Sequence, residues 1–508
     1  MTNCEQKNQK HKETSVFGKL EKHLEQAMAY QTALILIEWD NETLAPEQAG
    51  PYTARVQGTL SAAYQSVMTS SEVQKLLRQC EAESLSEQEC AIVREAKEEM
   101  ERLACIPPEE YRAYQELVSE STRIWAKARE DDDFDAFAPT LKKIISYQKK
   151  FASYRAKEGQ KLYDVMLDSY EKGFDMEKLN EFFGKLKEEL VPFLKKVMDS
   201  GVEIRDEFLT GAYPEEKQQE LAHFLAEYVG FDFTKGVMAV SAHPFTTSLH
   251  NHDVRITTHY SDHVDSSLFS VIHEAGHGIY EMGVEDCLTQ TLIGQGASMG
   301  MHESQSRFME NIVGRNGAFW VPVYQKLQEM FPDQLGDISR EQFVEAVNKV
   351  QPGLIRTEAD ELCYSLHVLV RYELEKKLIE EALDVKELPK LWADYYEKYL
   401  GVRPATDAQG VLQDIHWAQG SFGYFPSYAL GSAFAAQMYA WMREHMDFEG
   451  LLRSGDIQAI VKVLGEHIHK YGKLKESREL LKAMTGEDFD PDYYIRYLKE
   501  KYGTLYHV

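Results

Sequence analysis

Apolar residues recur at every third or fourth position along most of the chain, which is the period of amphipathic helices. In the first half this pattern covers residues 20–37, 86–105, 109–129, 137–158, 176–200 and 214–228. In the second half it covers residues 340–349, 355–383, 385–399, 430–447 and 457–471. Helix breakers separate the segments, as at Pro107, Gly230 and Pro352. The pattern predicts a mainly α-helical fold.

Residues 253–260 are the main exception. There β-branched or aromatic residues such as Val254 and Ile256 alternate with polar ones, which is the period of a half-buried strand. Residues 236–240 are the candidate partner strand. A small sheet at this point could hold an extended peptide along an exposed edge. A purely structural hairpin is the alternative.

Residues 273–277 read His-Glu-Ala-Gly-His, and the segment 266–282 around them has helical spacing. Histidines four apart project from one face of a helix, so His273 and His277 can bind the same metal ion. Glu274 is placed to accept a proton from a metal-bound water. Gly276 and Gly278 are poor helix formers, which indicates that another backbone or a substrate passes close by. The motif predicts a metallohydrolase.

A third ligand is expected on a later helix. Residues 301–312 carry an apolar stripe, and Glu303 lies off it. Two histidines and a glutamate from a second helix form the gluzincin arrangement, a zinc site that keeps one position open. His302 is the competing ligand, but neighbouring helical positions point about 100° apart, so only one of the two is expected to bind. Zinc is the expected ion, with cobalt or manganese as substitutes.

The composition is that of a globular protein, with 508 residues, of which 43% are hydrophobic and 27% charged. No apolar run approaches the roughly 18 residues of a membrane span. Because no clear boundary appears, residues 15–508 are expected to form a single large catalytic unit after a flexible, hydrophilic tail at residues 1–14. The 6 cysteines are scattered without a Cys-x-x-Cys pair, which favours a reducing cytoplasm.

The charge balance excludes two classes of partner. The net charge is −27 at pH 7 and the isoelectric point is about 5.1. Nucleic acids and anionic membranes require concentrated positive charge, so neither is an expected partner. The same field repels an anionic substrate at long range, so a carboxylate brought to the metal requires local arginines.

Six motifs follow one another along the chain. They are His-Pro-Phe at 243–245, Asp-Val-Arg-Ile-Thr at 253–257, the metal motif at 273–277, His-Glu-Ser-Gln at 302–305, Ile-Arg-Thr-Glu-Ala-Asp at 355–360 and Gly-Val-Leu-Gln-Asp-Ile-His-Trp at 410–417. Residues 38–40 and 420–425 extend the likeness toward both ends. In these motifs the chain resembles the thermostable-carboxypeptidase (Taq carboxypeptidase) family of zinc peptidases.

The resemblance implies a mostly helical gluzincin-type fold with a deep active-site groove, assembled as a homodimer. It implies zinc-dependent release of single residues from peptides with a free C-terminus, with broad specificity. The metal ligands of the family match His273, His277 and Glu303, and its catalytic glutamate matches Glu274.

Other polar residues in these motifs are candidates for steps that metal and base do not perform. Tyr424 and His416 lie in a glycine- and aromatic-rich segment that reads as a loop, and either could stabilise the tetrahedral oxyanion. His243 is a third candidate, because the turn imposed by Pro244 would hold it beside the strand.

An enzyme that acts at C-termini must also bind the free α-carboxylate, which a planar guanidinium does through two parallel hydrogen bonds. Arg356 and Arg255 are the candidates, although either could be a structural ion-pair partner, for example of Asp253. Asp360 and Asp414 are candidates to orient the metal-binding histidines.

Two other functions remain open from the sequence. A gluzincin endopeptidase, oligopeptidase or aminopeptidase would share the metal site, but blocking the C-terminus of a peptide would not stop its cleavage. A non-catalytic helical scaffold would bind no zinc. The intact Glu274 argues against a scaffold.

Overall fold

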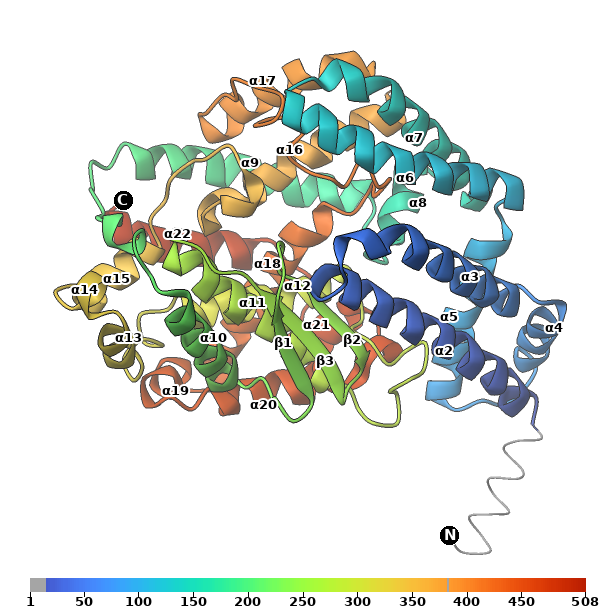
Figure 1. Ribbon diagram of the computed structural model, residues 1–508. Helices are drawn as coiled ribbons and strands as arrows, with labels where there is room; N and C mark the ends of the chain where they lie inside the picture. The colour runs from blue at the N-terminus through green and yellow to red at the C-terminus, as the bar shows by residue number, and fades with distance from the viewer. Residues whose placement is uncertain (1–14, 382) are drawn as a thin grey trace, which may run out of the picture.

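The structure is a computed structural model that describes residues 15–381 and 383–508. The predicted flexible tail at residues 1–14 lies outside the described residues. Helices make up most of the molecule, and a small three-stranded sheet lies beside them (Figure 1). The prediction of a mainly α-helical fold with a small sheet is therefore confirmed.

The helices before the sheet are α2 (Val16–Thr43), α3 (Gly50–Met68), α4 (Ser71–Cys80), α5 (Glu87–Ala104), α6 (Pro108–Asp131), α7 (Phe134–Arg155), α8 (Leu162–Asp168), α9 (Met176–Met198) and α10 (Glu215–Val229). Those after it are α11 (Val264–Met282), α12 (Met299–Arg307), α13 (Tyr324–Met330), α14 (Pro332–Leu335), α15 (Arg340–Val347), α16 (Glu361–Glu380), α17 (Leu388–Leu400), α18 (Pro426–His445), α19 (Phe448–Ser454), α20 (Ile457–His467), α21 (Ser477–Thr485) and α22 (Asp492–Tyr506). Short 3₁₀ helices are η1 (Glu47–Ala49), η2 (Glu207–Leu209), η4 (Arg356–Glu358), η5 (Val385–Glu387) and η6 (His469–Leu474), whereas η3 (Phe308–Gly314) is a π-helix that continues α12.

Most predicted helices are present with ends that differ by a few residues. The helix predicted over residues 355–383 is in part wrong, because Asp360 accepts a hydrogen bond from the backbone N–H of Cys363 and starts α16 as its N-cap. Residues 356–358 form the separate turn η4. α3 is absent from the predicted set, and the reason is physical: Met68 is its one buried residue, so no buried stripe marks the helix in the sequence.

The sheet consists of β1 (Gly236–Val240), β2 (Thr246–His250) and β3 (Asp253–Thr258) in the order β1-β3-β2. β1 pairs with β3 as predicted, but in parallel, so the two strands do not form a hairpin. β2, which is mainly polar and was not expected as a strand, lies antiparallel on the other side of β3. Val254 and Ile256 are fully buried on one face of β3, where Ile256 contacts α11.

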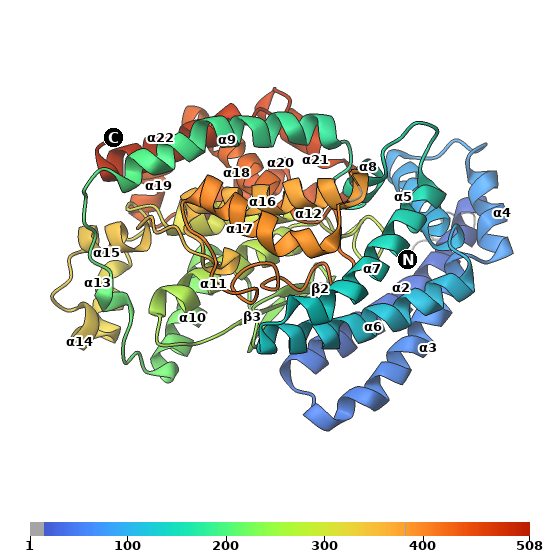
Figure 2. The same cartoon turned by 90° about the horizontal axis from the view of Figure 1, so that it is seen from above.

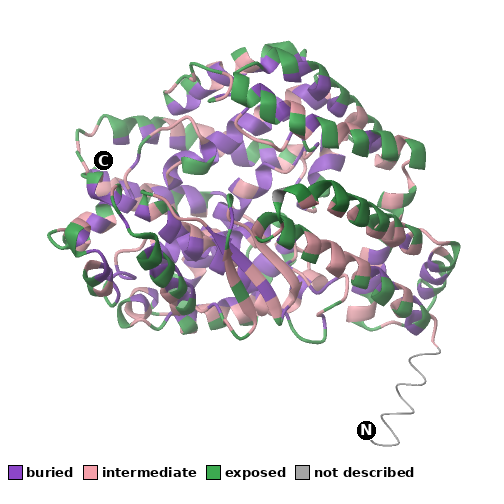
Figure 3. Ribbon diagram, in the orientation of Figure 1, coloured by how far each residue is buried: buried purple, intermediate pink, exposed green. Residues whose placement is uncertain are grey.

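The buried core gathers around α11, α12, α16 and α18, whereas α3 is mostly exposed (Figure 3). α11 lies between the sheet and α12, and α12 lies between α11 and α18. Seen from above, α9 and α22 run along one side of the molecule and the α2–α3 pair lies toward the other (Figure 2). A second, smaller apolar cluster joins α2, α4 and α5 to the segment 284–293.

Two buried helices therefore meet in the middle of the molecule, and both carry residues of the predicted metal site. Within residues 15–381 and 383–508, no helix is both long enough and apolar enough to cross a membrane.

Candidate metal centre and active site

Glycine lets the two metal-site helices approach each other closely. A Cβ atom at Gly276 of α11 would lie 2.7 Å from the carbonyl oxygen of Gln305 and 2.8 Å from the Cα of Ser306, both in α12. At Gly278 it would lie 2.7 Å from the ring of Phe231. The expectation of close backbone approach at Gly276 is therefore confirmed, and the chain has no room for a side chain there.

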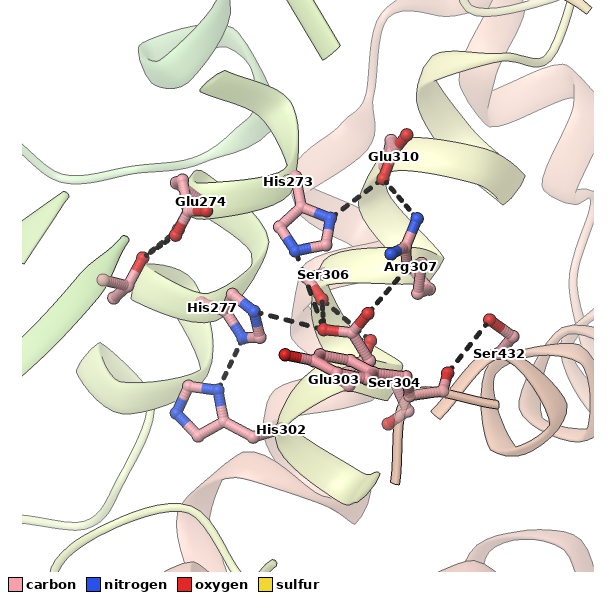
Figure 4. Close-up of polar contacts among 12 residues, drawn as sticks. His273, Glu274, His277, His302, Glu303, Ser304, Ser306, Arg307, Glu310 and Ser432 are labelled. Atoms are coloured by element: carbon pink, nitrogen blue, oxygen red, sulfur yellow. Dashed lines mark hydrogen bonds and ion pairs between the residues drawn. The ribbon is translucent and has the colours of Figure 1, made fainter. Parts of the chain in front are cut away.

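The three predicted ligands come together where α11 faces α12. Nε2 of His273 lies 3.6 Å from Oε2 of Glu303, and Nε2 of His277 lies 3.5 Å from the same oxygen. One ligand atom from each residue lies within 4.8 Å of the others. Figure 4 shows both imidazoles directed at the Glu303 carboxylate. Two nitrogens and one oxygen at this spacing suit a divalent ion with an open coordination position.

Hydrogen bonds on the outer side of the imidazoles leave both Nε2 atoms free to act as ligands. Nδ1 of His273 donates to Oε2 of Glu310 at 2.8 Å. Nδ1 of His277 lies 2.5 Å from Nδ1 of His302, whose Nε2 lies 2.9 Å from Oε1 of Glu281. A metal at Nε2 requires the proton of each ligand histidine on Nδ1.

This requirement fixes the direction of the hydrogen bonds that run from His277 through His302 to Glu281. His277 donates to His302, and His302 donates from Nε2 to Glu281. His302 therefore contacts a ligand and is not itself in the ligand set, which favours Glu303 over its competitor. The donor set and its outer hydrogen bonds fit a metal ion.

Buried charges hold the Glu303 carboxylate in its ionised form. Nε of Arg307 donates to Oε1 of Glu303 at 2.7 Å, and Nη1 of Arg307 donates to Glu310 at 3.2 Å. Burial acts to raise the pKa of Glu303, but Arg307, His273 and His277 outweigh it, so the pKa lies below its usual value. Burial itself lowers the pKa of His277 to about 3. At His277 a charged carboxylate thus lies beside a neutral imidazole, which is the protonation state that metal binding needs. At His273 burial acts to lower the pKa, but the negative charges of Glu303 and Glu310 outweigh it and raise the pKa.

Glu274 lies on the side of α11 that faces β2 (Figure 4). It is buried, and its Oε2 accepts a hydrogen bond of 2.6 Å from the Thr246 hydroxyl. Burial raises the pKa of Glu274 above its usual value. A carboxylate that is held in place and made more basic is suited to accept a proton.

The structure corrects the prediction for the residues that orient the histidines. Asp360 accepts hydrogen bonds from the backbone N–H groups of Cys363 and Gln351. Asp414 binds two arginines and contacts neither metal histidine. Both candidates are wrong, because the segments that carry them pack against α16 and not against the outer edge of α11. Glu310 and His302 have this role instead.

Tyr424 and His416 lie together with a third residue, Tyr428. Ring centroids are 5.4 Å apart for His416 and Tyr424, and 5.1 Å apart for Tyr424 and Tyr428. Nε2 of His416 lies 3.0 Å from the Tyr428 hydroxyl. Burial, followed by the negative charge of Glu303, raises the pKa of Tyr424 to about 12. Burial lowers the pKa of His416 to about 4, so at pH 7 the group consists of neutral donors.

The two candidate arginines occupy different places. Arg356 is buried, bonds Asp414 through Nε and Nη2, and lies 4.7 Å from the ring centroid of Tyr428. Arg255 lies on the face of β3 opposite to Ile256 and so points away from α11. It forms two hydrogen bonds with Asp253. The structure groups Arg356, and not Arg255, with the residues beside the metal centre.

His243 lies in the loop between β1 and β2 and its side chain is exposed. Burial, followed by the nearby His243, lowers the pKa of His259, whose Nε2 lies 3.0 Å from the Ser266 hydroxyl at the start of α11. The structure therefore places His243 beside the sheet, as predicted, but records no contact between it and the three metal ligands.

Five contributors to the site are missing from the sequence predictions: Arg307, Glu310, Glu281, Thr246 and Tyr428. Arg307 and Glu310 follow Glu303 by four and seven positions, which is one helical face, so this spacing could have identified them. Thr246 sits in the unexpected strand β2, and Tyr428 lies in the first turn of α18. No local pattern distinguishes these two from ordinary polar residues.

Together, the paired histidines, the glutamate on the next helix and the adjacent acidic residue define a mainly helical metallopeptidase. The comparisons with known proteins agree. Residues 19–502 match the Carboxypeptidase Taq (M32) metallopeptidase family, and the chain belongs to that family. It is accordingly a peptide hydrolase of the metallocarboxypeptidase type.

Relatives cover nearly the whole chain. Carboxypeptidase 1 of Bacillus subtilis is 41% identical over 481 residues, which is 94% of this chain and 96% of that protein. Thermostable carboxypeptidase 1 of Pyrococcus furiosus is 37% identical over 92% of this chain and 94% of its own length. The crystal structure of an M32 carboxypeptidase from Deinococcus radiodurans has a TM-score of 0.94 at 34% identity, covering 97% of this chain and 100% of that one.

Proposed function

We propose that this protein is a zinc-dependent carboxypeptidase that releases single residues from the C-termini of peptides with broad specificity. The observation that carries the proposal is the convergence of His273, His277 and Glu303 beside the buried carboxylate of Glu274. Its membership of a metallocarboxypeptidase family supports the direction of cleavage.

The metal would be held by the two Nε2 atoms and the Glu303 carboxylate. A bound zinc ion supplies Lewis acidity, which polarises the scissile carbonyl and makes a water molecule acidic near neutral pH. Cobalt or manganese can take its place at a nitrogen and oxygen site. Two hydrogen bonds fix the orientation of the ligand rings: one from His273 to Glu310 and one from His277 to His302.

Glu274 has the role of general base. It accepts the proton of the attacking water and later delivers it to the departing amine, so that the same carboxyl serves both halves of the reaction. The Thr246 hydroxyl bonds Oε2 of Glu274, which fixes the direction of the carboxylate. Burial raises the pKa of Glu274 above its usual value, which makes this carboxylate a stronger base.

We assign to Tyr424, which packs against His416 and Tyr428, the donation of a hydrogen bond to the oxyanion that forms at the scissile carbonyl. The pKa of Tyr424 is about 12, so its hydroxyl keeps its proton at neutral pH and can act as a donor. For His243 we propose no oxyanion role, since the structure shows no contact between its side chain and the three predicted metal ligands.

For the free carboxylate of the substrate we favour Arg356 over Arg255. The Arg356 guanidinium uses Nε and Nη2 for Asp414 and Nη1 for Tyr364, which leaves part of its five-donor fork unused. Arg255 is separated from α11 by the sheet. We also propose a homodimer in a reducing compartment, on the family resemblance and the scattered cysteines; light scattering in solution tests the first of these.

The experiment that tests the direction of cleavage uses two versions of one peptide, with a free C-terminus and with a C-terminal amide. Mass spectrometry of the free peptide should show a ladder of products that each lack one more C-terminal residue, whereas the amide should stay intact. Arg356→Ala should slow the ladder strongly, and Arg255→Ala is its matched control. Internal cleavage, or equal cleavage of the amide, would favour an endopeptidase or oligopeptidase instead.

A further inference from the structure

A buried glutamate outside the metal centre binds both ends of the segment that carries His416 and Tyr424. Glu375 lies in α16 and is 0% exposed. Its Oε1 accepts a 2.8 Å hydrogen bond from the indole Nε1 of Trp417. Its Oε2 accepts 2.8 Å and 2.7 Å bonds from the backbone N–H of Gly423 and the hydroxyl of Tyr163.

Each oxygen of Glu375 therefore holds the direct neighbour of a candidate catalytic residue. Trp417 follows His416, and Gly423 precedes Tyr424. Trp417 and Gly423 are both buried, so neither N–H group can turn to water if the carboxylate moves. A buried donor without a partner is costly, which makes the two bonds stiff constraints on the segment 416–424.

The packing around Gly423 removes the remaining freedom of the backbone. Gly423 has φ +88°, a conformation that favours glycine, and a Cβ there would lie 2.9 Å from the backbone N of Leu167. The ring of Tyr424 then packs edge-on against Tyr170 at 5.0 Å. The fixed backbone at Gly423 and the contact with Tyr170 together determine the direction of the Tyr424 side chain.

Glu375 satisfies three buried donors, a task that does not require a full negative charge. All three of its hydrogen-bond partners are neutral, and burial raises the pKa of Glu375 to about 7. Burying the charged carboxylate is costly, and the three donors and the positive charge of Arg371 offset that cost only in part. What the carboxylate does offer is two acceptor atoms about 2 Å apart that can hold two separate donors at once.

We propose that Glu375 is a positioning residue that sets His416 and Tyr424 relative to the metal centre. The inference rests on the oxyanion role given above to those two residues. Glu375 touches neither substrate nor metal and acts through Trp417 and Gly423.

The variant Glu375→Gln keeps the shape of the side chain but replaces one acceptor oxygen by a donor, so one of the two constraints is lost. Because a small misplacement of a catalytic group can reduce the rate by about 100-fold, we expect kcat to fall by about 10- to 100-fold. The amount of bound metal and the KM for the peptide substrate should change much less. Trp417→Phe removes the hydrogen bond between Trp417 and Glu375 by deleting its donor. It is the alternative variant if Glu375→Gln does not fold.

A double-mutant cycle separates positioning from general destabilisation. If Glu375 acts through Tyr424 or His416, then Glu375→Gln should cost less than about threefold in kcat in at least one of the backgrounds Tyr424→Phe and His416→Gln. Tyr163→Phe is the matched control, because it removes a bond to Glu375 but leaves both bonds to the segment. It should lower the thermal midpoint while changing kcat by less than about twofold.

Two results would overturn the inference. One is a loss in kcat for Glu375→Gln that is undiminished in both backgrounds. The other is a loss of kcat in Tyr163→Phe that is as large, relative to its loss of stability, as the loss of kcat in Glu375→Gln. Full activity of both Tyr424→Phe and His416→Gln would instead contradict the oxyanion role itself, and the positioning role with it, whereas the peptide ladder would still report C-terminal release.

Discussion

The replacement Gly431→Ala should weaken metal binding although Gly431 is not a ligand. Gly431 lies in α18, where that helix crosses the stem of Glu303. A Cβ at this position would lie 2.6 Å from both Cβ and Cγ of Glu303 and 3.0 Å from its carbonyl carbon. One added methyl group therefore pushes directly on the proposed metal ligand Glu303.

The size of the push follows from the distances. Ordinary contact begins at 3.4 Å, so the new methyl and the Glu303 stem must separate by about 0.8 Å, the difference between 3.4 and 2.6 Å. The Glu303 side chain cannot simply rotate away, because Arg307 binds its Oε1 at 2.7 Å. Metal sites tolerate ligand displacements of about 0.2 Å. The overpacking itself should lower the free energy of unfolding by about 1–3 kcal/mol.

The assay is competition for zinc with a chelator of known affinity, followed by thermal unfolding with and without metal. We expect metal affinity to fall by about 10- to 100-fold, which is the range for disturbed ligand support. Gly465→Ala is the matched control: it lies in α20 with nothing within 4 Å of the new methyl, so it should leave affinity unchanged and stabilise the helix by up to about 1 kcal/mol. Wild-type affinity in Gly431→Ala would refute the placement of Glu303 as a ligand.

Three further predictions concern single carboxylates. Glu274→Gln should keep its metal but lose kcat by about 10²- to 10⁴-fold, because the general base is gone; metal analysis with a peptide assay checks both, and normal turnover would contradict the mechanism. Glu310→Gln should lower metal affinity by about 10- to 100-fold in the chelator assay, because His273 loses its charged acceptor; an unchanged affinity would make Glu310 irrelevant to the site. Burial raises the pKa of Glu171 to about 7 from a usual 4.5, so its contribution to stability is present below pH 4.5 and is lost as the pH rises through 7. Wild-type protein should therefore lose up to about 3 kcal/mol of stability between pH 4.5 and 8 from this group, and denaturant unfolding of Glu171→Gln should show a smaller loss; identical pH profiles would speak against it.

Much of the metal site follows from the sequence because its spacing lies within single helices. A helix repeats every 3.6 residues, so the shared face of His273 and His277 is determined by their four-residue separation alone. The prediction of Glu303 required one further step. It needed a second helix on which this glutamate lies away from the apolar stripe. The glycine at 276 likewise indicated close approach of another backbone or a substrate, and the structure shows that the neighbour is the backbone of α12.

The same spacing says nothing about which helix lies opposite. His302 and Glu303 are neighbours in sequence, yet one binds the outer edge of His277 and the other faces its Nε2, because α12 meets α11 at one particular rotation. Arg255 and Arg356 look alike as candidates, but strand alternation turns Arg255 away from α11. Asp414 is held by two arginines from distant segments and so never reaches the histidines.

The sequence by itself determined the helical class and the shared face of His273 and His277 on α11, because repeating backbone dihedrals translate position directly into direction. For the third ligand it left Glu303 and His302 as competitors. Only the tertiary structure decided which residues support those ligands, which arginine lies beside them, and how Glu375 holds the segment between His416 and Tyr424. Those contacts join residues far apart in the chain, and they depend on how whole helices pack, a property that no local pattern encodes.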